Sequence, residues 1–347
     1  MEKYILNETP VRTTEGFKIN NINIELDIPE LEDFDDFIIE NSKNIEITYK
    51  KINKPIETKI GITYKKYYEV NIRILENSIN NELIVLTNSF ENNSSLIDNI
   101  NITFSKGSKA NLLINYNSVI SKYTYHHLIQ KVTMEENSNG TISIINNLNK
   151  ESVNMLEIET NIENSATLKT NIFDLGASKI INRFYGKLNN FKATNYLNNI
   201  YIGQNKDIID MNYHVQNIGK NTFNNIEVQG VLMDEASKNF KGTIDFIEGS
   251  SKSVGKENEN CILLSEKAKS KSLPMLLCHE EDVEGAHGVS TGKVDEEKLF
   301  YLNSRGYSEK EALKLIVNSN FNKIIKEVEN EEVEDRLYTL IDEKLSM

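Results

Sequence analysis

The chain has 347 residues, of which 39% are hydrophobic and 26% charged, and its formal net charge is -13 at pH 7. This balance is typical of a globular protein, and the length is enough for a sizeable core. The acidic charge argues against a nucleic-acid-binding protein, because neutralising phosphates needs clustered Lys and Arg.

The sequence carries no sign of export or membrane insertion. Its first residues, MEKYILNETPVRTTEG, lack the apolar region and small-residue cleavage site of a signal peptide. No apolar run approaches the roughly eighteen residues of a membrane span. We therefore expect a cytoplasmic protein with no membrane partner. Its two cysteines, Cys261 and Cys278, are expected to remain thiols in a reducing compartment.

Residues 1–95 mix alternating segments, such as YYEVNIRI and ELIVLTNS, with an acidic stretch at 26–40. Strict alternation of apolar and polar residues is the period of a half-buried strand. We predict a small N-terminal cap region of mixed α and β structure.

Residues 96–293 are dominated by short alternating segments separated by small polar turns. Examples of the strands are ANLLINY, TISII, NNIEVQGVLM and GTIDFIE, and examples of the turns are SKGSK and EENSNG. Dipeptides of tight hairpins are nearly absent, since only Asn139-Gly140 qualifies. The imperfect repeat favours a mainly β fold with a β-helix core over the alternative, a large antiparallel sandwich.

Residues 294–347 change to a helical pattern, so we predict a C-terminal helical subdomain. Acidic residues from Asp295 open a first helix, and Gly306 follows its end, where a left-handed cap suits glycine. Ser308 and Glu311 form a capping box for a second helix, and an apolar stripe from Val333 predicts a third.

The segment LPMLLCHEEDVEGAHG, residues 273–288, concentrates side chains that can bind metal or titrate. Thiolate, imidazole and carboxylate are ligands for iron or zinc, and the segment holds Cys278, His287, Glu280 and Glu281. The spacing is loose and lacks a Cys-x-x-Cys pair. A buried cysteine beside a solvated acidic edge therefore remains an alternative. The chain contains no GxGxxG, Walker or HExxH motif, so we expect it to bind no nucleotide itself.

Residues 240–317 resemble the core domain of the SufB/SufD family, the scaffold subunits of the SUF machinery for iron–sulfur cluster assembly. The resemblance rests on Phe240-x-Gly242-x-Ile244, LLSxxA at 263–268, Pro274, DVxxxHG at 282–288, and LFYLxSRG at 299–306 followed by SxxEA. Two positions depart from the SufB pattern. Ala268 stands where SufB-type members have a cysteine, and Leu277 where an acidic residue is usual.

The resemblance implies a right-handed parallel β-helix, C-terminal helices that dock onto the SufC-type ABC ATPase, and pairing of two scaffold subunits through their β-helices. The resemblance places His287 on the histidine of SufD-type members, and Cys278 would replace the missing SufB thiolate. We therefore expect Cys278 and His287, with Glu280 or Glu281, to hold iron or a transient iron–sulfur cluster. Docking of the ATPase is expected on Phe300, Tyr301, Leu302, Arg305 and Gly306. The chain would then be a scaffold and not an enzyme. Two alternatives are a structural SufD-like partner that binds no cluster and, more remotely, a β-helix polysaccharide lyase or hydrolase.

Overall fold

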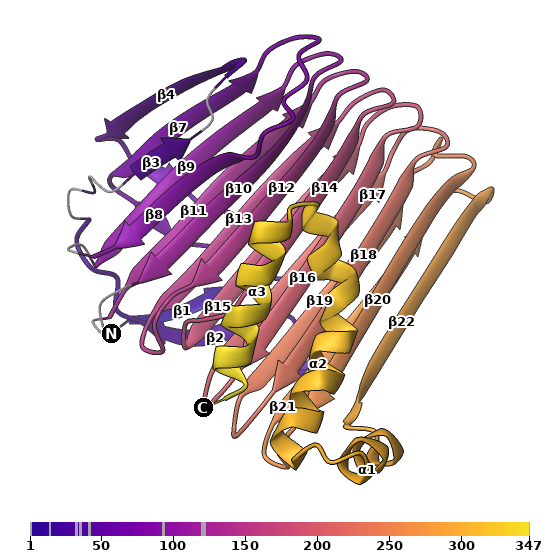
Figure 1. Ribbon diagram of the computed structural model, residues 1–347. Helices are drawn as coiled ribbons and strands as arrows, with labels where there is room; N and C mark the ends of the chain where they lie inside the picture. The colour runs from indigo at the N-terminus through magenta and orange to yellow at the C-terminus, as the bar shows by residue number, and fades with distance from the viewer. Residues whose placement is uncertain are drawn as a thin grey trace.

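The computed structural model of the chain describes residues 2–13, 15–31, 34, 37–40, 43–91, 94–118 and 123–346. Its body is a parallel β-solenoid made of two facing nine-stranded sheets (Figure 1). Successive strands alternate between the sheets, so each turn of the solenoid, here called a rung, contributes one strand to each sheet. This confirms the predicted mainly β fold with a β-helix core.

The sheet on the side of the C-terminal helices is called the helix-side sheet. In spatial order it contains β22 (Val283–Lys293), β20 (Ser253–Leu263), β18 (Phe223–Leu232), β16 (Thr194–Gly203), β14 (Thr167–Asp174), β12 (Asn139–Asn147), β10 (Lys109–Ser118), β8 (Ile84–Phe90) and β3 (Phe37–Glu40).

The opposite sheet is called the hairpin-side sheet. It contains β21 (Lys269–Cys278), β19 (Ser237–Phe246), β17 (Ile208–Asn217), β15 (Lys179–Leu188), β13 (Val153–Ile162), β11 (Tyr125–Met134), β9 (Ser95–Phe104), β7 (Tyr67–Ile74) and β4 (Ile45–Ile52). All neighbours pair in parallel except β3 on β8 and β4 on β7, which are antiparallel.

The polar turns of the sequence form a stacked column along one edge of the solenoid. Each contains a residue with positive φ, and the backbone N–H of that residue donates to a carbonyl in the turn of the next rung, as Asn137 does to Asn164. Positive φ is cheapest for Gly and tolerable for Asn. The column consists of Asn77, Gly107, Asn137, Ser165, Lys192, Asn221 and Lys252.

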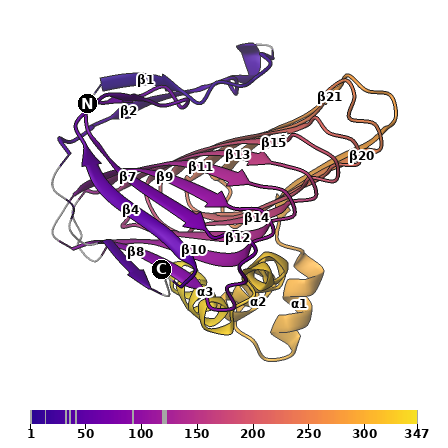
Figure 2. The ribbon, with the colours of Figure 1, turned by 90° about the horizontal axis from the view of Figure 1, so that it is seen from above.

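Both outer faces of the solenoid are partly covered (Figure 2). The antiparallel hairpin of β1 (Glu2–Leu6) and β2 (Ile22–Leu26) packs apolar side chains on the hairpin-side sheet. Helices α2 (Glu309–Ile325) and α3 (Glu331–Lys344), joined by the 3-10 helix η2 (Lys326–Val328), pack on the helix-side sheet. Helix α1 (Glu296–Ser304) has no buried residue and projects from the body.

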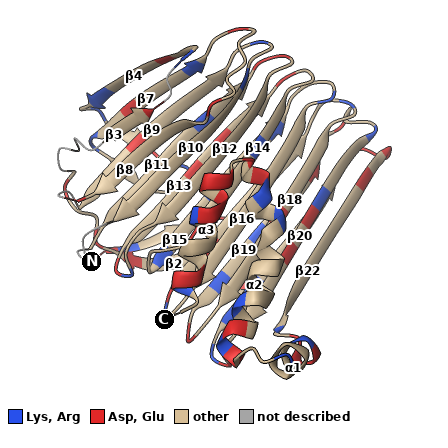
Figure 3. Ribbon diagram, in the orientation of Figure 1, with Lys and Arg blue, Asp and Glu red and all other residues tan. Residues whose placement is uncertain are grey.

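The helical caps agree with the sequence. The capping box of Ser308 and Glu311 is present, with both of its hydrogen bonds. Gly306 follows α1 with a φ of 97°. Glu331, Glu332 and Glu334 lie in the first turn of α3, at the positive end of its dipole (Figure 3).

Residues 1–95 differ from the prediction in two respects. The solenoid already begins within them, because β7 pairs in parallel with β9, and β8 with β10. Among the described residues of this range, the only helical segment is the three-residue 3-10 helix η1 (Glu15–Phe17), and the rest of the regular structure is strand, including β5 (Ile56–Glu57) and β6 (Thr63–Tyr64). The alternating segment YYEVNIRI therefore forms the solenoid strand β7 and does not belong to a separate cap of mixed α and β structure.

Candidate functional site

The last rung of the solenoid is open. Strands β21 and β22 end the two sheets, so in the described chain each pairs on one side only. Their side chains are correspondingly less buried: Pro274 and Leu276 of β21 are half-buried, whereas Gly242 and Ile244, their partners on β19, are buried. The predicted metal-binding segment is this rung and its turn.

His287 lies within β22 on the face directed into the solenoid. It is in register with Glu257 of β20. Gly285 lies two residues earlier in the strand and therefore on the same face as His287. A Cβ added at Gly285 would lie 2.9 Å from the Leu276 side chain, so this face is directed into the solenoid. His287 itself is exposed, since no rung covers it.

Cys278 is an exposed free thiol at the end of β21, in register with the buried Phe246. It lies on the opposite sheet from His287, and the turn 279–282 separates the two strands. His287 is four residues beyond Val283, roughly 13 Å along the strand. The two side chains thus lie on facing strands at the open end without forming a closed ligand set. Among described residues, no group of three or more His, Cys, Asp and Glu side chains is already arranged to hold a metal.

Glu280 is engaged in the turn beside Cys278. One carboxylate oxygen accepts a hydrogen bond of 3.0 Å from the backbone N–H of Gly249, and the other accepts from those of Glu281 and Asp282 at 3.1 and 3.4 Å. This side chain therefore stabilises the turn as it stands. Glu281 is exposed.

The carboxylate beneath His287 is Glu257, which sequence reasoning missed. The residue is 1% exposed, and neither of its carboxylate oxygens has a hydrogen-bond partner among the described residues. It occupies the space above Gly242, where an added Cβ would lie 2.3 Å from its carboxyl carbon. The pKa of Glu257 is raised to about 8, mainly by burial and secondly by the negative charge of Glu259.

The charge of Glu259, in contrast, is balanced by a neighbouring cation. Its carboxylate pairs with the ammonium of Lys238, and both side chains are fully buried. Ser272 of the last rung donates to the same carboxylate. Such a buried pair depends on both partners, because removing one leaves an uncompensated charge.

Cys261 shares this interior face of β20 with Glu257 and Glu259 and is fully buried, as expected for a core cysteine. Burial raises the pKa of its thiol. The alternation in VGKENENCIL could have placed all three side chains on one face. It could not have shown that the face is the interior one.

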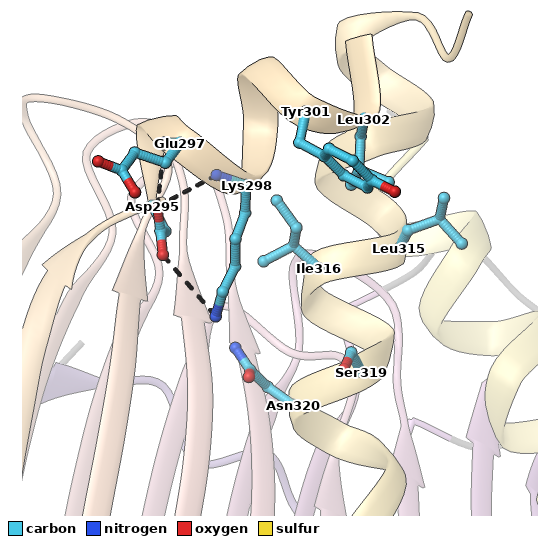
Figure 4. Close-up of a pocket in the computed structure, with 9 residues that line it drawn as sticks. All are labelled: Asp295, Glu297, Lys298, Tyr301, Leu302, Leu315, Ile316, Ser319 and Asn320. Carbon is cyan, nitrogen blue, oxygen red and sulfur yellow. Dashed lines mark hydrogen bonds and ion pairs between the residues drawn. The ribbon is translucent and has the colours of Figure 1, made fainter. Parts of the chain in front are cut away.

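The predicted docking residues lie on α1 and just beyond its end. Phe300 is 76% exposed and Tyr301 55%, and the guanidinium of Arg305 lies 5.1 Å from the Tyr301 ring centroid. Leu302 is half-buried. A groove of about 620 Å³ runs between α1 and α2, and its apolar walls come from Tyr301, Leu302, Leu315 and Ile316 (Figure 4). Asp295 caps α1 at the polar end of this groove and pairs with Lys298 at 3.8 Å.

The molecule is thus a β-solenoid protein with an open last rung, buried carboxylates beneath that rung and an exposed aromatic helix beside it. Residues 85–320 match the family model described as SUF system FeS cluster assembly, SufBD core domain. The chain belongs to this SufBD family of iron–sulfur cluster assembly proteins. No helix of the described residues is long and apolar enough to cross a membrane.

Individual relatives match parts of the chain. It is 31% identical over 146 residues to iron–sulfur cluster assembly protein SufD of Bacillus subtilis, and 34% identical over 134 residues to a SufBD family protein of Pyrococcus horikoshii. These matches cover 42 and 38% of this chain and 33 and 29% of those proteins. SufD of Escherichia coli is 23% identical over 181 residues, which cover 52% of this chain and 43% of that protein. The matched part of the chain therefore spans less than half of the length of each of these relatives.

Glu257→Gln is expected to flatten the dependence of stability on pH. Since the pKa of Glu257 is raised from 4.5 to about 8, the folded chain keeps a proton that the unfolded chain loses between these values. The free energy of unfolding should therefore fall as pH rises through this range in the wild type, and fall less in the variant. Urea unfolding at pH 5.5 and 8.5 measures the difference.

The control for this experiment is Glu266→Gln, which neutralises an exposed carboxylate and should leave the pH dependence of the wild type unchanged. Equal pH dependence in the wild type and in Glu257→Gln would contradict the buried, protonated state of Glu257.

Proposed function

We propose that this chain is a scaffold subunit of the SUF machinery, which builds or transfers an iron–sulfur cluster where its open rung meets a second SufB/SufD-type subunit. The observation that carries the proposal is the coincidence of two features in one rung. Among the described residues no strand pairs with the outer edges of β21 and β22, and the same rung presents Cys278 and His287.

The unpaired backbone groups of the last described rung support pairing with a second scaffold. An edge strand exposes N–H and C=O groups that favour adding another strand. At the opposite end of the solenoid the antiparallel strands β3 and β4 cover β8 and β7. Strand β22 suits addition of a strand best, because its residues are mostly small, whereas Pro274 of β21 has no N–H to donate.

The side chains on the open rung suit a transient cargo. A thiolate, an imidazole and a carboxylate hold iron less tightly than four thiolates, which favours release of the product. Cys278 and His287 would bind iron or the nascent cluster from facing strands. Of the two acidic candidates, Glu281 is the better placed to join them, because Glu280 already accepts three backbone hydrogen bonds.

The energy source would be a SufC-type ABC ATPase bound at α1. Exposed aromatic and Arg side chains are enriched in interfaces, and Phe300, Tyr301 and Arg305 form such a group above the groove. ATP-driven movement of the docked helices would act by favouring one arrangement of the paired scaffolds over another. In this proposal the chain binds no nucleotide, catalyses no reaction of its own and works in the cytoplasm.

The main alternative is a structural SufD-like partner subunit, with the cluster ligands on the other scaffold. It keeps the open rung and the docking helix but gives Cys278 no role. The family assignment favours either form of cluster assembly over the carbohydrate-active alternative.

Anaerobic reconstitution with ferrous iron and sulfide tests the cluster site. In the presence of a cognate ATPase and second scaffold, the wild type should develop the visible absorption and Mössbauer signals of a cluster. Cys278→Ala and His287→Ala should each lose them. Cys278→Ala is expected to fold normally because the thiol is exposed.

The control for reconstitution is Ser290→Ala, an exposed change on the same β22 strand. Cluster formation undiminished in Cys278→Ala and His287→Ala would exclude these ligands and support the structural alternative.

Phe300→Ala and Tyr301→Ala test ATPase docking. Truncating a central aromatic residue of an interface typically costs about 2 kcal/mol, roughly 30-fold in Kd. Calorimetric titration with a SufC-type ATPase should therefore show weaker binding with each variant. Phe191→Ala, which removes an exposed aromatic side chain outside the helices, should bind like the wild type. Unchanged affinity in both α1 variants would move the docking surface elsewhere.

A further inference from the structure

Three chemically active side chains line up on the outer face of the hairpin-side sheet, away from the solenoid interior. His214 comes from β17, Asp245 from β19 and His279 from the turn after β21, so three successive rungs contribute one each. The Nε2 atom of His214 lies 3.3 Å from Oδ2 of Asp245, and the Nε2 atom of His279 lies 3.9 Å from Oδ1 of the same carboxylate.

Asp245 is the centre of this group and is incompletely satisfied. The residue is 6% exposed. Its Oδ2 atom also accepts a 2.9 Å hydrogen bond from the side-chain amide of Gln216, whereas Oδ1 has no hydrogen-bond partner among described residues. A buried polar atom without a partner is costly, so an unpaired carboxylate oxygen facing a histidine calls for an explanation.

The neighbours hold His214 and Asp245 in place and keep the carboxylate charged. The ring of Tyr185 packs edge-on against His214 at 5.1 Å, and its hydroxyl donates to the Gln216 side-chain oxygen at 2.7 Å. This contact orients the Gln216 amide so that its NH₂ faces Asp245. Burial alone would raise the pKa of Asp245, but hydrogen bonds from His214 and Gln216, together with the charges of the two histidines, lower it overall.

We propose that His214, Asp245 and His279 bind a divalent transition-metal ion through two imidazole nitrogens and one carboxylate. Imidazole and carboxylate ligands suit Zn²⁺, Fe²⁺ and Co²⁺. Bonds of about 2.0–2.1 Å in a tetrahedral site put neighbouring ligand atoms roughly 3.3 Å apart, the separation seen between His214 and Asp245. With both oxygens of Asp245 bound, the two imidazoles and the carboxylate would supply four ligand atoms.

His279 is the ligand that closes the site. Among the described residues, no three side chains are already arranged to hold a metal. In this group the distance that must shorten is the 3.9 Å from Nε2 of His279 to Oδ1 of Asp245. Its side chain is 64% exposed and can turn, while its backbone N–H is fixed by a 2.8 Å bond to the carbonyl of Phe246. A simple ion pair with His214 would leave Oδ1 of Asp245 unsatisfied. A metal bound to both histidines would also engage that oxygen.

This site is separate from the proposed cluster site. His279 follows Cys278 in sequence, but it contacts Asp245 on the outer face, whereas His287 is directed into the solenoid. The two proposals can therefore fail independently, and variants at the open rung serve as controls for the outer site.

The test is titration of the tag-free chain with Co²⁺ and Zn²⁺. Calorimetry measures binding of either ion, and the d–d absorption reports bound Co²⁺. The wild type should bind one equivalent at this site. His279→Ala and His214→Ala should each weaken binding at least about tenfold. His279→Ala keeps the test valid if the less exposed His214 proves necessary for folding. Cys278→Ser and His287→Ala should retain this equivalent and its spectrum.

Two results would overturn the proposal. One is a wild-type chain that binds neither ion. The other is unchanged binding in His214→Ala and His279→Ala, including the case in which only Cys278→Ser or His287→Ala loses the metal.

Discussion

Every rung of this solenoid depends on the rung next to it for its backbone hydrogen bonds. In a parallel ladder, buried N–H and C=O groups are satisfied by the neighbouring strand, so the stack is stable in its middle and exposed at its ends. The chain treats its two ends differently. Antiparallel β3 and β4 cover the first rungs, whereas β21 and β22 end their sheets without a further strand in the described structure. This asymmetry makes the last rung the natural place for a partner.

The chemistry of the chain is concentrated around that rung for the same reason. Most of the interior is filled by aliphatic and aromatic side chains. Just beneath the open end the interior contains Lys238, Glu257 and Glu259 instead. Lys238 and Glu259 pair with each other, whereas the Glu257 carboxyl group has no hydrogen-bond partner among the described residues. A second subunit that covers the open end would place these buried groups further from bulk water. Glu257, which has no hydrogen-bond partner in the part of the chain that the structure describes, is therefore the residue whose environment should respond most to assembly.

Much of the architecture was predictable from the sequence because it rests on local rules. Period-2 alternation identifies the strands, the polar turns mark the rung edges, and Ser308 with Glu311 marks the start of α2. Family motifs in residues 240–317 then identify the solenoid type. The prediction was wrong about residues 1–95, because alternation alone does not show whether a strand such as β7 pairs within a cap or with the next rung.

The candidate sites were harder to predict from the sequence, since they depend on the register between rungs. Glu257 and His287 are thirty positions apart and become neighbours only because β20 and β22 pair in one particular register. Likewise, nothing local in the sequence connects His214, Asp245 and His279. The sequence could single out Cys278 and His287 as residues of metal-binding types. It could not show that they lie on facing strands at an open end of the solenoid.

Hydrogen–deuterium exchange, with and without a second SufB/SufD-type subunit, tests the central claim that the open rung is the assembly surface. Complex formation is expected to slow exchange in peptides covering residues 269–293 and to leave exchange in the opposite edge strand, 45–52, unchanged. Protection confined to other surfaces, with exchange in 269–293 unaffected by a partner that does bind, would contradict it.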